Sequence, residues 1–490
     1  MKLIRLRIEN DTMAIAYHPV SGQAATANYL IAYNPNQAIS ENLENIKIRL
    51  AGLQFDAAIL ENGLSYPFSD TIVGVNYDRI DVGLALTNLL NIPVVSQAAV
   101  DQLGLTAAIK AKSAYLKWHL DYYGQYHGVR NNGQEAMLTI GNGYLGLRGA
   151  FLESHADKDN YPGTYIAGVF DQETTTLHNH QVTNEDLVNL PNAQFITFGI
   201  DQQPPFQLNE HDLQDVYRSL DLRTGMLTTT KLIQLASGHQ LRIRSQKVAN
   251  MRDWHRYSIR YQVTPLNFTG SLQIYSEIDG SVINGNVSRY NVFDQHHLNT
   301  MGIETAANTV YLSGQTKSSR INYTIGAKLT SPDVPVIKNF NSTQQPQGVQ
   351  QTVSLAVEAG KTYTFDKDVV IATSNAHDDP QLTHVQAELS QSSFDNTASV
   401  SKDYWEHTWR TTDIKVRGDI TSQRLLRVNI YHSFVSAAAL ESGQLDASVG
   451  ARGLHGEAYR GHVFWDEMFI LPFYTCLLYT SDAADELDGV

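Results

Sequence analysis

The feature that most constrains this fold is a long succession of short segments with alternating apolar and polar residues between positions 115 and 375. Thr, Tyr, Val and Ile are frequent in them, and turn residues separate one from the next. Alternation with a period of two places one apolar face on each strand, and many such strands indicate a large antiparallel β-sandwich. The clearest segments are GHQLRIRSQKV, HRYSIRYQVTP, GSLQIYSEIDGS, NTVYLSG, RINYTIGAKL and KTYTFDKDVVIATS.

The sequence changes character on both sides of this region. Residues 1–112 alternate apolar runs (MKLIRLRI, FDAAIL, IPVVS) with helix-like stretches such as DVGLALTNLL, which predicts a mixed α/β accessory unit. Residues 113–378 form the predicted sandwich, in which the polar stretch SPDVPVIKNFNSTQQPQGVQQ is expected to be a loop. Residues 379–412 show helical periodicity, and we predict a helical linker there, followed by the opening of a helical domain. The predicted fold class is therefore multidomain α+β.

Composition excludes several classes of protein. Fifty acidic residues against 36 basic ones give a net charge of −14, which disfavours nonspecific binding to nucleic acid or anionic membrane. Cys476 is the only cysteine, so an intrachain disulfide is impossible. No uninterrupted apolar stretch reaches about 18 residues, and the first residues do not resemble a signal peptide. We expect a cytoplasmic location and no membrane or nucleic-acid partner.

Two groups of residues suggest chemistry but have simpler explanations. The stretch GNGYLGLRGAFLE (141–153) is rich in glycine, but it lacks the Lys-Ser/Thr pair of a phosphate loop, so a turn at a sandwich edge or domain contact is favoured. His178 and His180, and the adjacent His296 and His297, could suggest a metal. Because no cluster of partner residues with zinc-ligand spacing accompanies either pair, we predict no metal site.

The run ARGLHGEAYRGHVFWDEMFILPF (451–473) combines charge with aromatic character. Sugar sites commonly pair an aromatic face with carboxylates and arginines that bind hydroxyl groups. Trp465, Asp466 and Glu467 supply these groups, and the nearby basic residues could line the same wall: Arg452, His455, Arg460 and His462. The alternative is a helix start, in which the two acids favour the helix dipole and FILPF packs inward. Residue types alone leave both interpretations open.

Six dispersed motifs together resemble glycoside hydrolase family 65, which includes maltose, kojibiose and trehalose phosphorylases and a few hydrolases. They occur in the expected order between about 115 and 475, and they are GNGYLGLRG, GTYIAGVFD, LVNLPN, SEIDGSVIN, RVNIYHSF and DASVGARGLHGEAYRGHVFWDEMFILPF. The resemblance implies an N-terminal β-sandwich, a helical linker and an (α/α)₆ catalytic barrel. It assigns 413–475 to the start of that barrel, while residues 1–112 lie outside the usual family core.

The resemblance also implies an activity. In such a phosphorylase an α-linked, maltose-like glucose disaccharide reacts with inorganic phosphate, with inversion, to give β-glucose 1-phosphate and glucose. Trp465 and Asp466 would shape the glucosyl subsite, and Arg460, His462 and Glu467 would complete the substrate-binding set. No residue of this chain is expected to be the catalytic general acid, which should follow Val490. Phosphate would be a co-substrate and no cofactor is expected; dimers are common in the family, so a homodimer is one expected state.

The last part of the sequence departs from the family pattern. We expect a chain that stops inside the barrel, with residues 476–490 (CLLYTSDAADELDGV) forming a non-native tail that does not continue an amphipathic helix. Such a chain would be inactive by itself. Two further functions stay open: hydrolysis of an α-glucoside within the same family, and non-catalytic carbohydrate binding by the sandwich alone.

Overall fold

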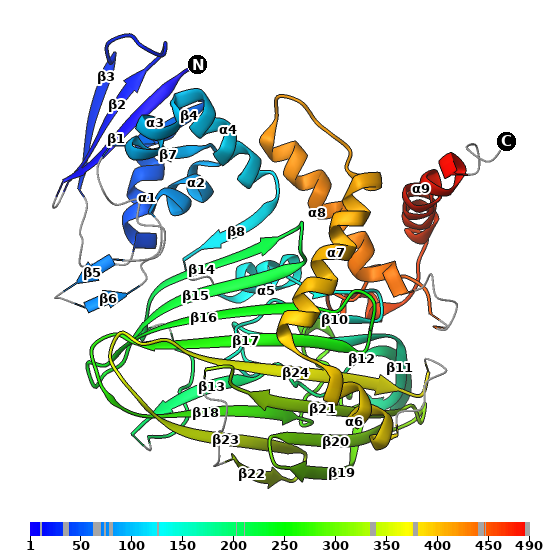
Figure 1. The fold of residues 1–490 in the computed structure, drawn as a ribbon. Helices are drawn as coiled ribbons and strands as arrows, with labels where there is room; N and C mark the ends of the chain where they lie inside the picture. The colour runs from blue at the N-terminus through cyan, green and yellow to red at the C-terminus, as the bar shows by residue number, and fades with distance from the viewer. Residues whose placement is uncertain are drawn as a thin grey trace.

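The computed structural model confirms the predicted fold class: a small N-terminal sheet with helices, large antiparallel sheets, and helices toward the C-terminus (Figure 1). It describes residues 1–9, 12–32, 39–61, 70–72, 75–77, 82–124, 127–201, 203–209, 211–333, 340–375, 381–439, 445 and 447–485.

The N-terminal unit is built on a five-stranded sheet with the order β3-β2-β1-β4-β7. The first three strands are antiparallel, whereas β1, β4 and β7 are parallel, as expected where helices connect them. The strands are β1 (Leu3–Glu9), β2 (Thr12–His18), β3 (Ala27–Ala32), β4 (Ala57–Leu60) and β7 (Val94–Ser96), and the helices are α1 (Ile39–Leu50), α2 (Val82–Leu90), α3 (Gln97–Leu103) and α4 (Leu105–Leu116). A separate small hairpin pairs β5 (Asp70–Ile72) with β6 (Val75–Tyr77).

The largest sheet of the sandwich has nine strands in the order β19-β20-β21-β24-β17-β16-β15-β14-β8. All neighbours are antiparallel, and the period-two alternation of the sequence becomes an alternation of buried and partly exposed side chains along β15 and β16. The strands are β8 (His119–Tyr123), β14 (Leu213–Asp221), β15 (Met226–Gln234), β16 (Gln240–Ala249), β17 (Arg256–Pro265), β19 (Leu298–Ala306), β20 (Thr309–Thr316), β21 (Asn322–Thr330) and β24 (Tyr363–Thr373).

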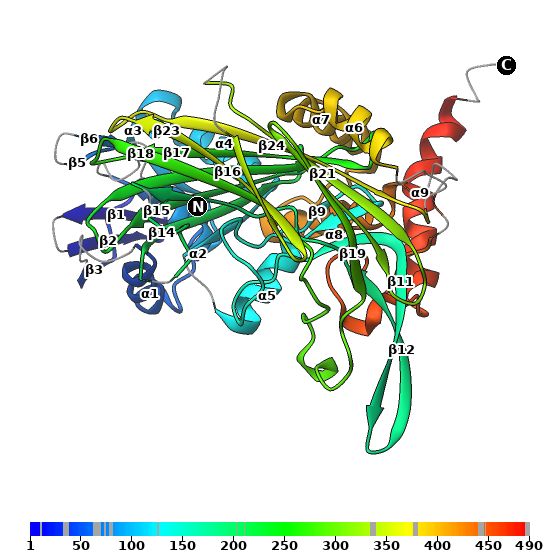
Figure 2. The same cartoon turned by 90° about the horizontal axis from the view of Figure 1, so that it is seen from below.

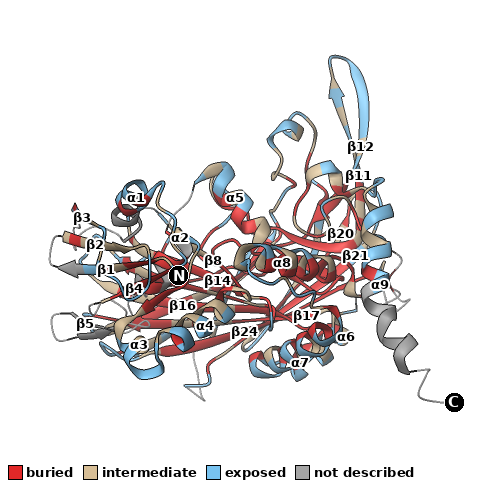
Figure 3. Cartoon of the chain, turned by 90° about the horizontal axis from the view of Figure 1, so that it is seen from above, coloured by how far each residue is buried: buried red, intermediate tan, exposed pale blue. Residues whose placement is uncertain are grey.

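Two four-stranded sheets complete this region. One has the order β13-β18-β23-β22 and the other β12-β11-β10-β9. Their strands are β9 (Ile140–Gly141), β10 (Leu145–Leu147), β11 (Thr164–Leu177), β12 (His180–Asn189), β13 (Ile196–Ile200), β18 (Gly270–Asp279), β22 (Phe340–Gln345) and β23 (Gly348–Val357). The tip of the β11–β12 hairpin projects from the molecule, as Figures 2 and 3 show.

One expectation is wrong. The polar stretch that we expected to be a loop contains β22 and the first residues of β23, and these two strands form an antiparallel hairpin with Gln345 paired to Gly348. Its polarity misled the sequence analysis because β22 is an edge strand with exposed side chains, so neither face requires apolar residues. Residues 334–339 of the same stretch lie outside the described part of the chain.

Helices α6 (Leu382–Gln391) and α7 (Phe394–Thr412) pack on the outer face of the nine-stranded sheet, and α8 (Ile420–Ala437) and α9 (Glu467–Asp485) follow (Figure 1). The buried indole of Trp405 on α7 stacks on Tyr431 of α8, with ring centroids 4.7 Å apart. This contact couples the helix on the sheet to the helix that leads toward residues 447–467.

The glycine-rich stretch is a packing turn, as the sequence favoured. A Cβ at Gly143 would lie 2.3 Å from the backbone nitrogen of Ala439, and one at Gly146 would lie 2.4 Å from Leu454 Cβ. Any side chain would therefore separate β9 and β10 from the end of α8 and from the segment that follows it.

Helix α9 continues to Asp485, although we expected residues from 476 onward not to extend an amphipathic helix. Leu and Ala favour helical backbone, so the weak periodicity of this stretch was a poor guide to its secondary structure. Among the described residues, no helix is long and apolar enough to cross a membrane.

Candidate functional site

The segment after α8 is held in a sharply turned conformation. The short helix η3 (Ala458–Gly461) contains Tyr459 and Arg460 at φ 59° and 58°, followed by Gly461 at φ 72°. Left-handed backbone at two consecutive non-glycine residues carries strain, so the surrounding contacts must impose it. A Cβ at Gly461 would lie 2.3 Å from Leu187 Cβ on β12, which shows how closely the turn approaches the sandwich.

Glu457 is the most enclosed carboxyl group of this segment, with 3% of the residue exposed. It accepts hydrogen bonds from the hydroxyls of Tyr161 and Tyr165, at 2.5 and 3.0 Å, and from the backbone N–H of Asn286 at 2.9 Å. Burial raises the pKa of Glu457 to about 7, although these hydrogen bonds and the charge of Arg148 oppose the rise. The carboxyl group thus joins three loops at one point.

Arg148, from the glycine-rich stretch, connects the sandwich to the same segment. Its guanidinium is buried and donates to the carbonyl of His455 at 2.6 Å, to the carbonyl of Asn132 at 2.9 Å and to Glu135 at 3.3 Å. His455 also lies 2.8 Å from His432 of α8, nitrogen to nitrogen. Burial lowers the pKa of His455 to about 4, so this imidazole is neutral at pH 7 and serves as a packing group.

Arg460 and His462 make their hydrogen bonds to the β11–β12 hairpin. The Arg460 Nη1 donates to both carboxylate oxygens of Asp186, at 2.7 and 2.8 Å, and its guanidinium lies over the Tyr290 ring, 4.4 Å from the centroid. His462 Nε2 lies 2.9 Å from the carbonyl of Glu185. Both side chains thus connect this segment to the β11–β12 hairpin. Their predicted role in substrate binding stays a prediction.

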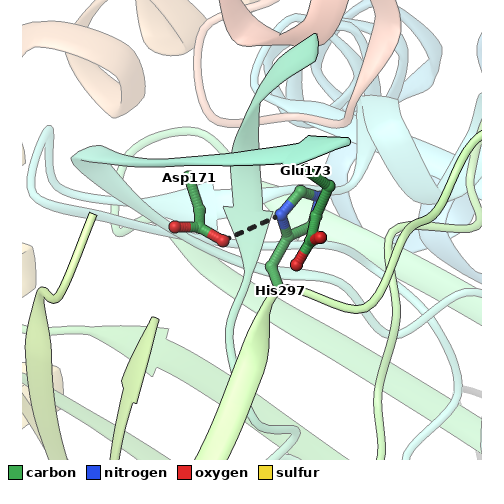
Figure 4. Close-up of side chains that lie close together, drawn as sticks. All are labelled: Asp171, Glu173 and His297. Atoms are coloured by element: carbon green, nitrogen blue, oxygen red, sulfur yellow. Dashed lines mark hydrogen bonds and ion pairs between the residues drawn. The ribbon is translucent and has the colours of Figure 1, made fainter. Parts of the chain in front are cut away.

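Asp186 also lies near a cluster of Asp171, Glu173 and His297, in which Asp171 and His297 are buried and Glu173 is partly exposed (Figure 4). His297 Nδ1 is 3.2 Å from Asp171, and its Nε2 is 3.8 Å from Asp186. Burial alone would raise the pKa of Asp171, but hydrogen bonds from His297 and from Ser318 and Ser319 lower it instead.

Such a group of one imidazole and two carboxylates could bind a divalent cation. Its negative charge already has partners, because Lys317 pairs with Glu173 at 3.4 Å and Arg460 pairs with Asp186. We therefore interpret the cluster as an anchor at the base of the hairpin.

The predicted sugar-binding residues lie at the beginning of α9. The Asp466 carbonyl accepts the first helical hydrogen bonds, from the N–H groups of Phe469 and Ile470, and Glu467 accepts one from the Ser448 hydroxyl. Trp465 is 69% exposed, and its indole meets Phe469 edge-on at 5.9 Å. The helix-start interpretation of these acids is therefore correct for the backbone. Its second part is wrong, because FILPF does not pack inward: Phe469 is 68% exposed and Phe473 40%. The indole is accessible for a ligand, and Asp466 is partly exposed.

The sequence analysis did not single out Glu457, Tyr161 or Asn286. The available signal was an acid flanked by glycines and followed by an arginine in GLHGEAYRG. Its partners could not be found from local spacing because they lie 171 and 296 residues away along the chain.

Comparison with known proteins defines the class. Residues 122–408 match the N-terminal domain of glycosyl hydrolase family 65, and residues 427–487 match the central catalytic domain of the same family. The chain belongs to glycosyl hydrolase family 65, which confirms the family resemblance of the sequence.

Individual relatives are phosphorylases. The chain is 34% identical over 360 residues to the trehalose 6-phosphate phosphorylase of Lactococcus lactis, covering 73% of this chain and 45% of the relative. It is 28% identical over 370 residues to the kojibiose phosphorylase of Caldanaerobacter subterraneus, covering 73% and 46%. The chain thus spans about half the length of these relatives.

A solved structure from the human microbiome, described as a kojibiose phosphorylase candidate, has the same fold. It superposes with a TM-score of 0.62 at 19% identity, covering 73% of this chain and 46% of that one.

Proposed function

We propose that the protein to which this chain belongs is a disaccharide phosphorylase. It breaks the bond between C1 of an α-linked glucosyl unit and the glycosidic oxygen, and phosphate attacks C1 from the opposite face. The products are β-glucose 1-phosphate and a free acceptor sugar, and a general acid donates the proton that the leaving oxygen requires. Because phosphate is already an anionic nucleophile, no general base is needed.

One observation carries the proposal: Trp465 and Asp466 stand together at the start of α9, within the residues that match the catalytic domain. An accessible indole can stack on the apolar face of a pyranose, and an adjoining carboxylate can accept hydrogen bonds from its hydroxyl groups. The names of the relatives support phosphorolysis as the reaction. We expect the general acid to come from outside residues 1–490.

The substrate is the finer part of the proposal. We propose an α-linked glucose disaccharide of the maltose type; the relatives' names add trehalose 6-phosphate, kojibiose and glucosylglycerol to the panel that must be compared. The protein encoded by the whole gene should release glucose 1-phosphate from one of these only when phosphate is present. Equal sugar release without phosphate would identify a hydrolase instead.

The same assay tests the site. Asp466→Ala in the whole protein should lower kcat/KM by roughly 100-fold or more, the usual result of removing one hydrogen-bonding group that stabilises a transition state. Asp403→Ala, an exposed acid on α7, is the matched control and should retain wild-type kinetics. Unchanged kinetics for Asp466→Ala would refute the assigned role of this carboxylate.

A further inference from the structure

A second cavity lies on the outer face of the nine-stranded sheet and contains none of the residues of the α9 site. It has a volume of about 700 Å³, within the range of roughly 300–1,000 Å³ that is common for small-molecule sites. Its floor is formed by side chains of β14 to β17, and Tyr115 of α4 and Thr362 contribute to its walls. We propose that this cavity, here called the sheet groove, binds a neutral oligosaccharide.

The floor of the sheet groove has an unusual composition. Where β15, β16 and β17 line the groove, their outward positions carry only hydrogen-bonding side chains, apart from Met226 at one end. A solvated sheet face commonly mixes lysines with acids, whereas here hydroxyl and amide groups surround two guanidinium groups. The floor residues are Thr228, Thr230, Arg242, Arg244, Gln246, Gln262 and Thr264.

These side chains are held in place by one another. Arg244 Nη1 donates to the amide oxygens of Gln246 and Gln262, at 3.3 and 3.2 Å. Arg242 Nη2 donates to the Thr264 hydroxyl at 2.9 Å. A ligand that binds such an array does not have to order it first, so less of its binding energy is lost to side-chain entropy.

The chemistry of the sheet groove favours a polyhydroxylated, uncharged ligand. Guanidinium and amide groups donate to hydroxyl oxygens, while amide and threonine oxygens accept from them, so both capacities of a sugar hydroxyl are met. The guanidinium groups of Arg242 and Arg244 would attract an anion, but an anion would leave the amide and threonine acceptors without a donor. Asp221 at one end, 3.7 Å from His119, would also oppose it.

The length of the groove also suits a chain of sugars. Gln246 and Arg242 lie four residues apart on β16, which corresponds to about 13 Å along a strand. One hexose ring is shorter than this distance, so the ligand that fills the groove has more than one ring. The choice of α-linked glucose units rests on the proposed function, and the proposed site would hold such a chain on the sandwich, apart from Trp465 and Asp466.

Isothermal titration calorimetry of the 490-residue chain with maltotetraose tests the proposal. We expect saturable binding that Arg244→Ala weakens at least tenfold and that Gln262→Ala, a milder change, weakens several-fold. Arg252→Ala, an exposed arginine outside the groove, should leave the affinity unchanged. Thermal unfolding of each variant verifies that it is folded. If Arg244→Ala does not fold, Gln262→Ala serves as the test.

The experiment also separates this site from the proposed catalytic one. Asp466→Ala should not change maltotetraose binding in the sheet groove, so the inference can stand even if the proposed function fails. Absence of heat at millimolar maltotetraose would overturn the inference. Binding that Asp466→Ala abolishes and that the groove variants leave intact would overturn it too, because the sugar would then occupy the α9 site. Stronger binding of glucose 6-phosphate than of maltotetraose would overturn the inference, because the groove would then prefer an anionic ligand.

Discussion

At the scale of single residues, the buried acid Glu457 makes the clearest case for a pH effect. Its pKa rises from 4.5 to about 7 because burial disfavours the charged form. The folded state therefore holds this proton more tightly than the unfolded chain does. The stabilisation is complete below pH 4.5 and is lost as the pH rises through about 7, and the rise in pKa corresponds to roughly 3 kcal/mol.

We expect Glu457→Gln to remove this dependence. The free energy of unfolding of the wild-type chain should fall between pH 5 and pH 8 relative to that of the variant, because glutamine carries no titrating proton. Urea unfolding at several pH values measures the difference, and Glu304→Gln, an exposed acid on β19, is the control. Parallel pH profiles for wild type and Glu457→Gln would contradict the assignment.

Residue-scale prediction from sequence was possible only where the relevant residue types are concentrated in one segment. Trp465, Asp466 and Glu467 could be singled out because aromatic and acidic groups adjoin one another. Glu457 could not, since its hydrogen-bond donors come from Tyr161, Tyr165 and Asn286, which only the folded chain brings together. Local sequence patterns carry no information about contacts between residues so far apart along the chain.

At the scale of elements, a largely buried ion pair helps to join the β11–β12 hairpin to η3. Asp186 is 2% exposed and is bound by Arg460, which also lies over two aromatic rings. Removing one partner of a buried pair leaves an uncompensated charge, which costs about 3–5 kcal/mol, whereas replacing both partners can be nearly neutral.

This argument predicts a non-additive pair of substitutions. Arg460→Met should lower the free energy of unfolding by about 3 kcal/mol, and Arg460→Met combined with Asp186→Leu should recover a large part of the loss. Urea unfolding of the two single variants and the double variant gives the coupling energy. Losses that simply add would mean that the pair does not hold the hairpin to η3.

Elements were predictable where burial imposes a period. The strands quoted from residues 238–374 are present because each must bury one face, and α7 follows the spacing of its buried residues. The edge hairpin β22–β23 was missed because an exposed strand needs no apolar face. The extension of α9 was missed because a helix with a weak apolar stripe has no clear period either.

At the scale of the whole molecule, the N-terminal unit is joined to the rest by several contacts. Tyr123 of β8 and Tyr217 of β14 belong to its apolar core, and Asn91 bonds to Thr421 and Arg424 at the start of α8. An accessory role for this unit stays a prediction, but its core is continuous with a sandwich strand, which local sequence patterns could not indicate.

Self-association of the chain also belongs to this scale. Six large apolar side chains just before and within the start of α9 are exposed, by 40% to 75%. They are Val463, Phe464, Trp465, Met468, Phe469 and Phe473. A concentration of exposed apolar side chains of this kind favours association, which the net charge of −14 opposes at low ionic strength. We therefore expect the 490-residue chain to self-associate, more strongly as salt screens the repulsion.

Sedimentation velocity over a range of concentration and salt tests this expectation. The double variant Met468→Lys/Phe469→Glu interrupts the apolar surface without a change in net charge, so it should shift the distribution toward monomer. Val292→Lys/Met301→Glu makes the same charge changes at two exposed apolar positions elsewhere and should leave association as in the wild type. If both double variants sediment like the wild-type chain, association does not involve α9. If the wild-type chain is monomeric at high salt, exposure of these side chains is insufficient to join two chains.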